Sequence, residues 1–107
     1  MKPLKLKKIV VNTPLEHCES VRAAMGEHGA ARIGSYSYCT FSYEGIGRCL
    51  PDATAKPYNE NSSATGVKEQ KIETFCREEE LQNVVKAIKK VHPYEEPVVS
   101  VFDFEAY

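Results

Sequence analysis

The stretch that decides the fold is His92-Pro93-Tyr94-Glu95-Glu96-Pro97, which joins the clearest helical pattern of the chain to its last strand pattern. Pro93 lacks the N–H group that a helix needs, and it moves His92 out of the helical region, so the preceding helix ends there. Pro97 favours extended geometry at Glu96 in the same way. The stretch therefore marks a junction between a helix and a strand.

The polar residues of this junction form a candidate site. If the segment is extended, His92, Tyr94 and Glu96 share one face, and Glu95 points to the other. His92 also ends a helix, where the helix dipole favours its cationic form. The alternative is that the prolines only end the helix and begin the strand, and that the polar residues between them are exposed to solvent.

The elements on either side follow clear patterns. A helix is predicted over residues 78–91, with acidic residues at its start and lysines at its end, as the helix dipole prefers. Its apolar stripe consists of Leu81, Val84, Val85, Ile88 and Val91. A strand is predicted over residues 97–105, with Val99 and Val101 on one face and Val98, Phe102 and Phe104 on the other.

The N-terminal part predicts a strand over residues 4–12 and then a helix that stops at Gly29. Thr13, Pro14 and Glu16 match a capping box with proline at the first helical position. The helical stripe consists of Leu15, Cys18, Val21 and Met25. Lys2, Lys5, Lys7 and Lys8 are typical of a solvated edge strand. His17 is expected to face solvent and His28 to lie in the last helical turn.

Two further strands are predicted, over residues 33–44 and 67–76. The first has bulky residues on both faces, and Gly45-Ile46-Gly47 is expected to break it without forming a nucleotide-binding fingerprint. In the second, Ile72, Thr74 and Cys76 share one face. Residues 51–66 are rich in Pro, Asn, Ser, Ala and Thr, so they predict one long loop, which is either functional or disordered.

The order β-α-β-β-α-β predicts a single α+β domain over residues 1–107 with the ferredoxin-like fold, in which both helices cover one face of an antiparallel sheet. The opposite face then needs a partner, because residues 33–44 and 97–105 are apolar on both sides. A homo-oligomer follows from this pattern.

Composition narrows the classes of function. The chain has 107 residues, of which 42% are hydrophobic and 27% charged, and its net charge of −1 argues against a general nucleic-acid binder. It contains no apolar run near the roughly 20 residues of a membrane helix and no signal-peptide core, which predicts a cytoplasmic protein without membrane contact. Four cysteines without a C-x-x-C pair are expected to be free thiols, mostly in the core.

Four segments in order resemble a known family: Gly34-Ser35-Tyr36-Ser37-Tyr38-Cys39-Thr40-Phe41, Gly45-Ile46-Gly47-Arg48-Cys49-Leu50-Pro51, Lys71-Ile72-Glu73 and His92-Pro93-Tyr94-Glu95-Glu96-Pro97. They are similar to the PII-like domain inserted in YqfO-type proteins, the dinuclear-metal proteins also described as GTP cyclohydrolase type 2 homologues. The last segment also resembles CutA, although this chain lacks tryptophan.

The resemblance implies a stand-alone copy of the insert, without the metal ligands of the flanking domain, so the hydrolase activity is not carried over. CutA is a trimer linked to tolerance of divalent cations. PII proteins are trimers whose long loop between the second and third strands engages protein partners, and residues 51–66 correspond to that loop in placement. A homotrimer with a partner at this loop is therefore implied.

Three classes of function follow, in descending order: a ligand-binding or regulatory module, a copper- or zinc-binding tolerance protein, and an enzyme. No Ser-His-Asp or Cys-His arrangement is legible for the last. The expected ligand site consists of Tyr36, Cys39, Tyr94, Glu95 and Glu96. His92 and Cys39 are the expected metal ligands, and a divalent ion is the one cofactor they would suit. The alternative reading is that Cys39 is a small core residue and His92 a helix cap.

Overall fold

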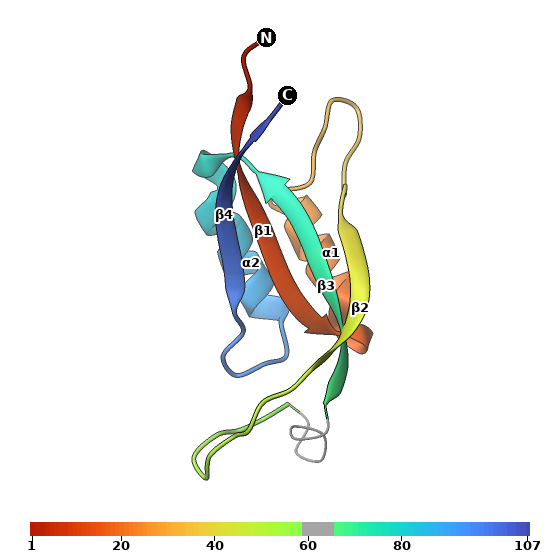
Figure 1. Cartoon of the computed structure of the whole chain (residues 1–107), viewed down its shortest axis with the longest axis vertical. Coiled ribbons are helices and arrows are strands. Elements are labelled where there is room, and N and C mark those ends of the chain that lie inside the picture. The colour runs from red at the N-terminus through yellow and green to blue at the C-terminus, as the bar shows by residue number, and fades with distance from the viewer. Residues whose placement is uncertain (59–65) are drawn as a thin grey trace.

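The fold is a four-stranded antiparallel sheet with both helices on one face, as seen in a computed structural model that describes residues 1–58 and 66–107 (Figure 1). The elements are β1 (Leu4–Pro14), a 3-10 turn (Leu15–His17), α1 (Cys18–Glu27), β2 (Phe41–Gly47), β3 (Val67–Cys76), a second 3-10 turn (Glu78–Glu80), α2 (Leu81–Val91) and β4 (Val99–Ala106). The strand order is β2-β3-β1-β4. This topology confirms the predicted ferredoxin-like α+β fold.

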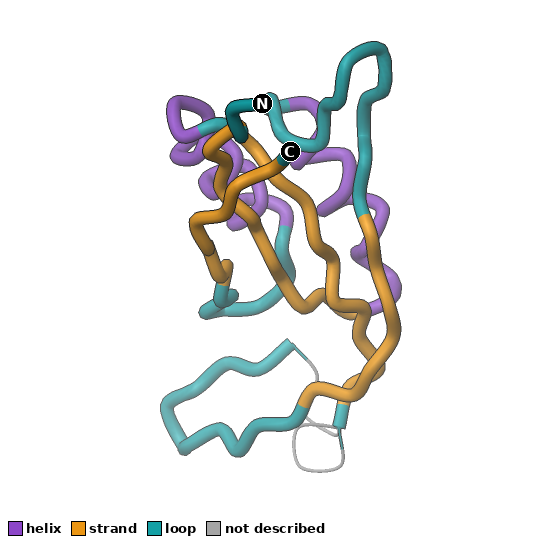
Figure 2. The backbone as a smooth tube through the Cα atoms, turned by 45° about the horizontal axis from the view of Figure 1, so that its top comes forward, coloured by secondary structure: helices purple, strands orange, loops and turns teal. Residues whose placement is uncertain are grey.

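Both helices lie against one face of the sheet (Figure 2). The hydrophobic core lies between that face and the helices. The register places Ile9 opposite Thr74 on one side and Val101 on the other, so these side chains share the face that the helices cover. The buried core residues are Ile9, Val11, Cys18, Val21, Met25, Ala30, Ala31, Ile72, Cys76, Val84 and Ile88. The predicted stripes of both helices are thus confirmed except at their ends, where Leu15 and Val91 are exposed.

The lysine-rich strand β1 is central, and the prediction of an edge strand is wrong. Two of its lysines are paired with acidic residues of the neighbouring strands: Lys7 Nζ lies 2.5 Å from Asp103 Oδ1, and Lys8 Nζ lies 2.9 Å from Glu73 Oε1. A lysine can therefore occupy a central strand, because its long stem reaches a carboxylate at the edge of the packed region.

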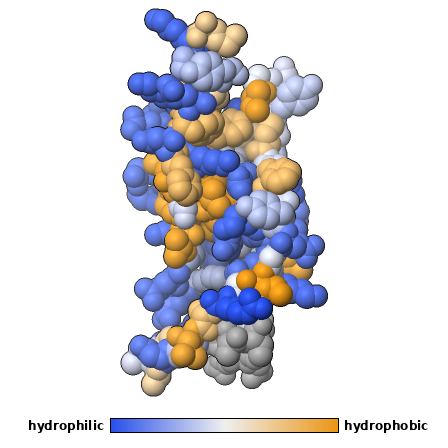
Figure 3. Space-filling view, viewed as in Figure 1, coloured by the Kyte–Doolittle hydropathy of each residue, from blue (hydrophilic) through white to orange (hydrophobic). Residues whose placement is uncertain are grey.

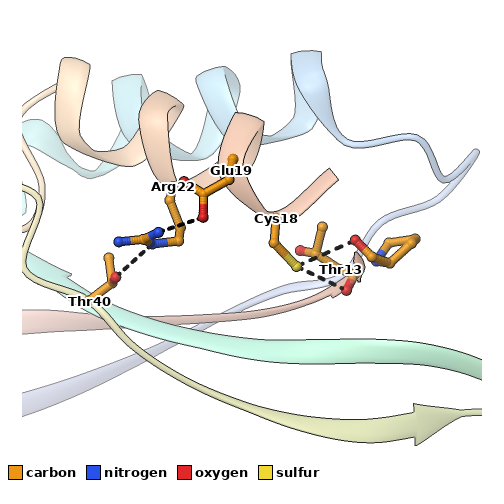
Figure 4. Close-up of polar contacts among 6 residues, drawn as sticks. Thr13, Cys18, Glu19, Arg22 and Thr40 are labelled. Carbon is orange, nitrogen blue, oxygen red and sulfur yellow. Dashed lines mark hydrogen bonds and ion pairs between the residues drawn. The ribbon is translucent and has the colours of Figure 1, made fainter. Parts of the chain in front are cut away.

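The start of α1 differs from the predicted capping box (Figure 4). Thr13 belongs to β1, where its backbone pairs with Gln70, and its buried Oγ1 has no hydrogen-bond partner among the described residues. The chain turns through the 3-10 turn instead, without a side-chain cap. Cys18 Sγ donates to the carbonyl oxygens of Thr13 at 3.6 Å and Pro14 at 3.4 Å. The strand ladder extends two residues further than predicted and takes Thr13 into the core.

The end of α1 agrees with the prediction. Gly29 has a φ of +103°, and the N–H of Ala30 donates to the carbonyl of Met25 at 3.1 Å, which closes the helix. His28 Nδ1 lies 2.8 Å from the carbonyl oxygen of Ala24, so this histidine belongs to the last turn as expected.

The second predicted strand is wrong over residues 33–40, which form a hairpin between α1 and β2. Ile33 and Tyr36 exchange backbone hydrogen bonds of 3.0 and 2.8 Å around Gly34, whose φ is +53°. Glycine adopts this left-handed conformation without steric cost, which allows the tight turn. β2 begins only at Phe41 and includes Gly45-Ile46-Gly47, the tripeptide predicted to break it.

The sheet face opposite the helices carries aromatic side chains from three strands: Phe41, Tyr43, Phe75, Phe102 and Phe104. Figure 3 looks onto this face and shows apolar side chains gathered over the strands among hydrophilic neighbours. Phe41 is 68% exposed and Phe102 is 56% exposed. The expectation that β4 is apolar on both sides is confirmed.

The segment that follows β2 has no regular structure over residues 48–58, in agreement with the predicted loop. The remainder of that predicted loop, residues 59–65, lies outside the described residues. Across residues 1–58 and 66–107, no helix is long and apolar enough to cross a membrane.

Candidate functional site

A groove with a volume of about 540 Å³ lies at one end of the sheet. Three segments line it: the last residue of β2 with residues 48–58 after it, the first residues of β3, and residues 94–98 between α2 and β4. The last segment is the proline-flanked stretch that the sequence singles out. Because Pro93 ends α2 and the chain must return to the edge of the sheet, the polar residues of this stretch are held next to the groove.

His92 is a structural residue at the base of this segment, and it is only 7% exposed. Its Nδ1 accepts a hydrogen bond of 3.2 Å from the backbone N–H of Tyr94. Its Nε2 must therefore carry the proton, which it donates to the carbonyl of Asn12 at 2.8 Å. Burial lowers the pKa of His92 and so disfavours the cationic form that the helix dipole was expected to favour.

Tyr94 and Glu69 form the polar centre of the groove. The phenol of Tyr94 donates to Glu69 Oε2, and Glu69 is only 6% exposed. Gly47 makes room for this carboxylate, since a Cβ at that position would overlap Glu69 Oε1. Burial, and then the hydrogen bond to Glu69, raises the pKa of Tyr94, so the phenol stays protonated and acts as a donor.

The segment after β2 is tied to both sides of the groove. The backbone N–H of Lys56 donates to Glu95 Oε1 at 3.0 Å, and the phenol of Tyr58 donates to Glu16 Oε2 at 2.9 Å. The ring of Tyr58 lies 5.9 Å from that of Tyr94 and meets His17 edge-on at 5.5 Å, both distances between ring centroids. His17 is therefore half-buried, where the sequence predicted a solvent-facing residue.

The structure brings together Tyr94, Glu95 and Glu96 of the predicted ligand site, since all three line the groove. Glu95 was expected on the face opposite Glu96. That expectation is wrong because the chain bends at residues 94–96 and is not extended there. Tyr36 lies elsewhere, exposed in the hairpin of residues 33–40, where it pairs with Ile33.

Cys39 also lies away from the groove. Its carbonyl accepts a hydrogen bond from Thr74 Oγ1, whereas His92 contacts Asn12, which pairs with Lys71. Cys39 therefore lies at the position of Thr74 along β3, and His92 lies near that of Lys71. These two positions are three residues apart on the strand, which corresponds to about 10 Å. Within one chain, the two expected metal ligands are therefore apart, and residues 1–58 and 66–107 contain no group of three or more His, Cys, Asp or Glu placed to hold a metal ion.

The sequence-based prediction of the site did not include two residues of the groove, Glu69 and Tyr58. Glu69 stands in Lys68-Glu69-Gln70-Lys71, a charged strand segment with no local sign that one carboxylate is buried. Tyr58 had a weak signal, because it is an aromatic residue in a segment otherwise rich in small and polar residues. Both meet Tyr94 only through tertiary contacts.

The sheet order, the helices on one face and the long connection between β2 and β3 define a small α+β domain of the PII-like kind. A likeness in fold supports this class: the PII-like protein CutA from Nostoc sp. PCC 7120 superposes with a TM-score of 0.52 at 19% identity, over 92% of this chain and 80% of that one. At such an identity, the likeness concerns the fold alone.

Closer similarity is to segments of larger proteins, the GTP cyclohydrolase 1 type 2 homologues. The homologue of Bacillus subtilis is 43% identical over 101 residues, which cover 94% of this chain and 27% of that protein. The homologue of Halalkalibacterium halodurans is 42% identical over 98 residues, 91% of this chain and 26% of that protein. A Bacillus cereus protein related to NIF3 superposes with a TM-score of 0.80 at 37% identity, over 99% of this chain and 28% of that one.

The chain thus spans about a quarter of the length of the curated relatives it matches. No protein-family model matches it. The resemblance inferred from the four motif segments is confirmed, and it concerns a small domain of these relatives.

Proposed function

We propose that this chain is a ligand-binding or regulatory module of the PII/CutA-like type, acting in the cytoplasm as a homotrimer and taking a small ligand in the groove between Tyr58, Glu69 and Tyr94. The observation that carries the proposal is the groove itself: a concave site with aromatic walls and a few convergent polar groups is the usual form of a small-molecule site. The four cysteines are free thiols, which suits a reducing compartment.

The same contacts supply a route for regulation. Residues 48–58 approach the groove from one side, and they are held there by Lys56 to Glu95 and Tyr58 to Glu16. A ligand that displaced Tyr58 or Glu95 would change the position of this segment, because both contacts are made by exposed groups and are weak. The segment of residues 51–66 would then engage a protein partner in one ligand state and release it in the other.

The proposal does not include catalysis. The names of the relatives refer to GTP cyclohydrolase, and those proteins are about four times as long as the matched segment. The groove pairs a phenol with a carboxylate, but the described residues offer it no nucleophile activated by a base.

A CutA-like role in binding copper or zinc is the alternative function. It would need Cys39 and His92 from different chains, and His92 would have to give up the hydrogen bond to Tyr94 or to Asn12. Elemental analysis of the purified protein distinguishes the two roles, because the alternative requires stoichiometric metal and the module does not.

The direct test of the module is a ligand screen. Purified protein is equilibrated with pools of small metabolites, and retained compounds are identified by mass spectrometry. We expect at least one retained compound, with weaker retention by Tyr58→Leu than by the control Glu105→Gln, an exposed carboxylate on β4. A screen that retains nothing, or retention equal in both variants, would contradict the proposed site.

A further inference from the structure

We propose that the ligand of this groove is a small organic cation, an amine or guanidine attached to an apolar or aromatic body, and that Glu69 is its countercharge. The inference rests on the proposed function and names the chemical class of its ligand. It follows from the position of charge, aromatic surface and apolar surface around the groove.

The decisive charge is the buried one. Arg48, Lys56, Glu95 and Glu96 line the groove but are exposed, so water and salt screen their fields. Glu69 is 6% exposed, and its field is screened far less. The lining therefore combines an excess of negative charge with one desolvated carboxylate at its centre.

This carboxylate has no countercharge among the described residues. Its hydrogen-bond partner there is the neutral phenol of Tyr94. His92, the nearest buried base, is neutral because its Nδ1 accepts a hydrogen bond from the backbone. A carboxylate can accept about four hydrogen bonds, and a buried one is most stable beside a cation. An incoming ammonium group would supply both the missing charge and the missing donors.

The walls of the groove favour an organic cation. The ring centroids of Tyr58 and Tyr94 lie 5.9 Å apart with an interplanar angle of 56°, and both residues line the groove together with Glu69. Cations attached to carbon bind favourably over aromatic faces. Leu50 is 88% exposed and Val98 is 76% exposed, and both border the same groove, where the apolar body of the ligand would cover them.

A metal ion fits this site less well. Divalent ions such as Ca²⁺ and Mg²⁺ take six or more oxygen ligands, and Zn²⁺ takes about four ligands. The part of the chain that the structure describes contains no cluster of three acidic, histidine or cysteine residues suited to one. One buried carboxylate bonded to Tyr94, whose ring packs against that of Tyr58, favours a monovalent organic cation.

Three probes of similar shape test the charge preference: benzylamine, a cation at neutral pH, neutral benzyl alcohol and the anion benzoate. Binding is measured by calorimetry or by NMR chemical-shift titration. We expect the wild type to bind benzylamine most tightly and benzoate least. Glu69→Gln keeps the shape of the side chain, and we expect it to weaken benzylamine binding about 10- to 100-fold. The matched control Glu105→Gln removes an exposed charge from β4 and should bind as the wild type does.

Circular dichroism establishes that each variant is folded. Should Glu69→Gln not fold, Tyr58→Leu replaces it, and we expect about a two- to fivefold loss of benzylamine binding from the missing aromatic face. Tightest binding of benzoate by the wild type, or equal binding by Glu69→Gln and Glu105→Gln, would overturn the inference. If the metabolite screen also retains nothing, the proposed function fails; if it retains only anions in this groove, the site stands and the cation assignment alone is wrong.

Discussion

Glu69 and Tyr94 connect the start of β3 to the segment between α2 and β4 through a hydrogen bond between a buried carboxylate and a half-buried phenol. Such a bond stabilises the fold more than an exposed one does, because without it the buried carboxylate would have neither water nor a donor to bind. The two residues therefore contribute both to the groove and to the stability of this end of the sheet.

Tyr94→Phe tests that contribution. The variant keeps the ring and removes the donor to Glu69, so we expect the free energy of unfolding in urea to fall by about 1–3 kcal/mol. Tyr58→Phe is the matched control, because its phenol bonds the exposed Glu16, and it should lose less than about 1 kcal/mol. Equal losses in the two variants would show that the burial of Glu69 adds nothing.

His92 predicts a dependence of stability on pH. Burial lowers its pKa in the folded state below the ordinary value of 6.5, so the unfolded chain binds a proton more readily than the folded chain does. The contribution of His92 is complete above pH 6.5, and it is lost as the pH falls through the folded-state pKa.

Urea unfolding of the wild type and His92→Gln, measured from neutral pH down to about pH 5, checks this. We expect the stability of the wild type to fall across the window and the variant to fall less steeply. His28→Gln is the control, because His28 is exposed, and its curve should follow that of the wild type. A variant curve parallel to the wild type would exclude His92 as the cause.

At the scale of elements, the sequence predicted the bounds of β3 but not the hairpin before β2. The bounds of β3, residues 67–76, were predicted correctly, because Ile72, Thr74 and Cys76 alternate toward the core. Residues 33–40 were predicted as a strand from their Tyr, Thr and Ser content, but Gly34-Ser35 turns the chain between Ile33 and Tyr36. Propensity is weak evidence where a turn residue contradicts it.

The sequence predicted the part of the candidate site that has a local signal, and it missed the part that depends on strand pairing. Tyr94 and Glu96 belong to a proline-flanked stretch whose composition marks a junction, so they stand out locally. The alternation expected there failed at Glu95, because proline restricts its neighbours but does not force an extended run. Glu69 becomes part of the site only because β3 pairs with β2 at Gly45 and Gly47.

The hairpin of residues 33–40 is held against α1 by Tyr38, whose ring lies over Gly26, and by Arg22 Nε, which donates to Thr40 Oγ1 at 3.0 Å. Tyr38 has a φ of +57°, an uncommon conformation for a bulky residue. The contact with the helix is possible because Gly26 has no side chain, since a Cβ there would overlap the ring.

Gly26→Ala is therefore expected to destabilise the protein by about 1–3 kcal/mol in thermal or urea unfolding, although alanine favours helix over glycine. In the background of Tyr38→Ala the overlap is absent, and the same substitution should be neutral or stabilising by up to about 1 kcal/mol. A stabilising effect of Gly26→Ala in the wild-type background would show that Tyr38 does not pack there.

At the scale of the whole molecule, the aromatic face of the sheet is the feature that a single chain leaves unexplained. Phe41, Phe75, Phe102 and Phe104 lie on it, together with Tyr43, whose phenol donates to Glu73. A large exposed apolar patch on a soluble protein marks an interaction surface. In the proposed homotrimer, these faces would pack against one another.

Phe102→Lys tests the role of this face. Assembly would bury the new charge among aromatic side chains, which is strongly unfavourable. We therefore expect the variant to be monomeric at micromolar concentration and to keep its circular dichroism spectrum. Val91→Lys is the control: it replaces a partly exposed apolar residue on α2, away from the aromatic face, and should assemble as the wild type does. Monomers from both variants would point to general destabilisation.

The most direct test of the proposed homotrimer is the mass of the wild-type assembly, measured by native mass spectrometry and by light scattering after gel filtration. With the aromatic face covered by other copies, we expect three chains of 12.0 kDa, a particle of about 36 kDa, over the micromolar range. A particle of 12.0 kDa under the same conditions would contradict the account, because the face would then have no partner of its own kind.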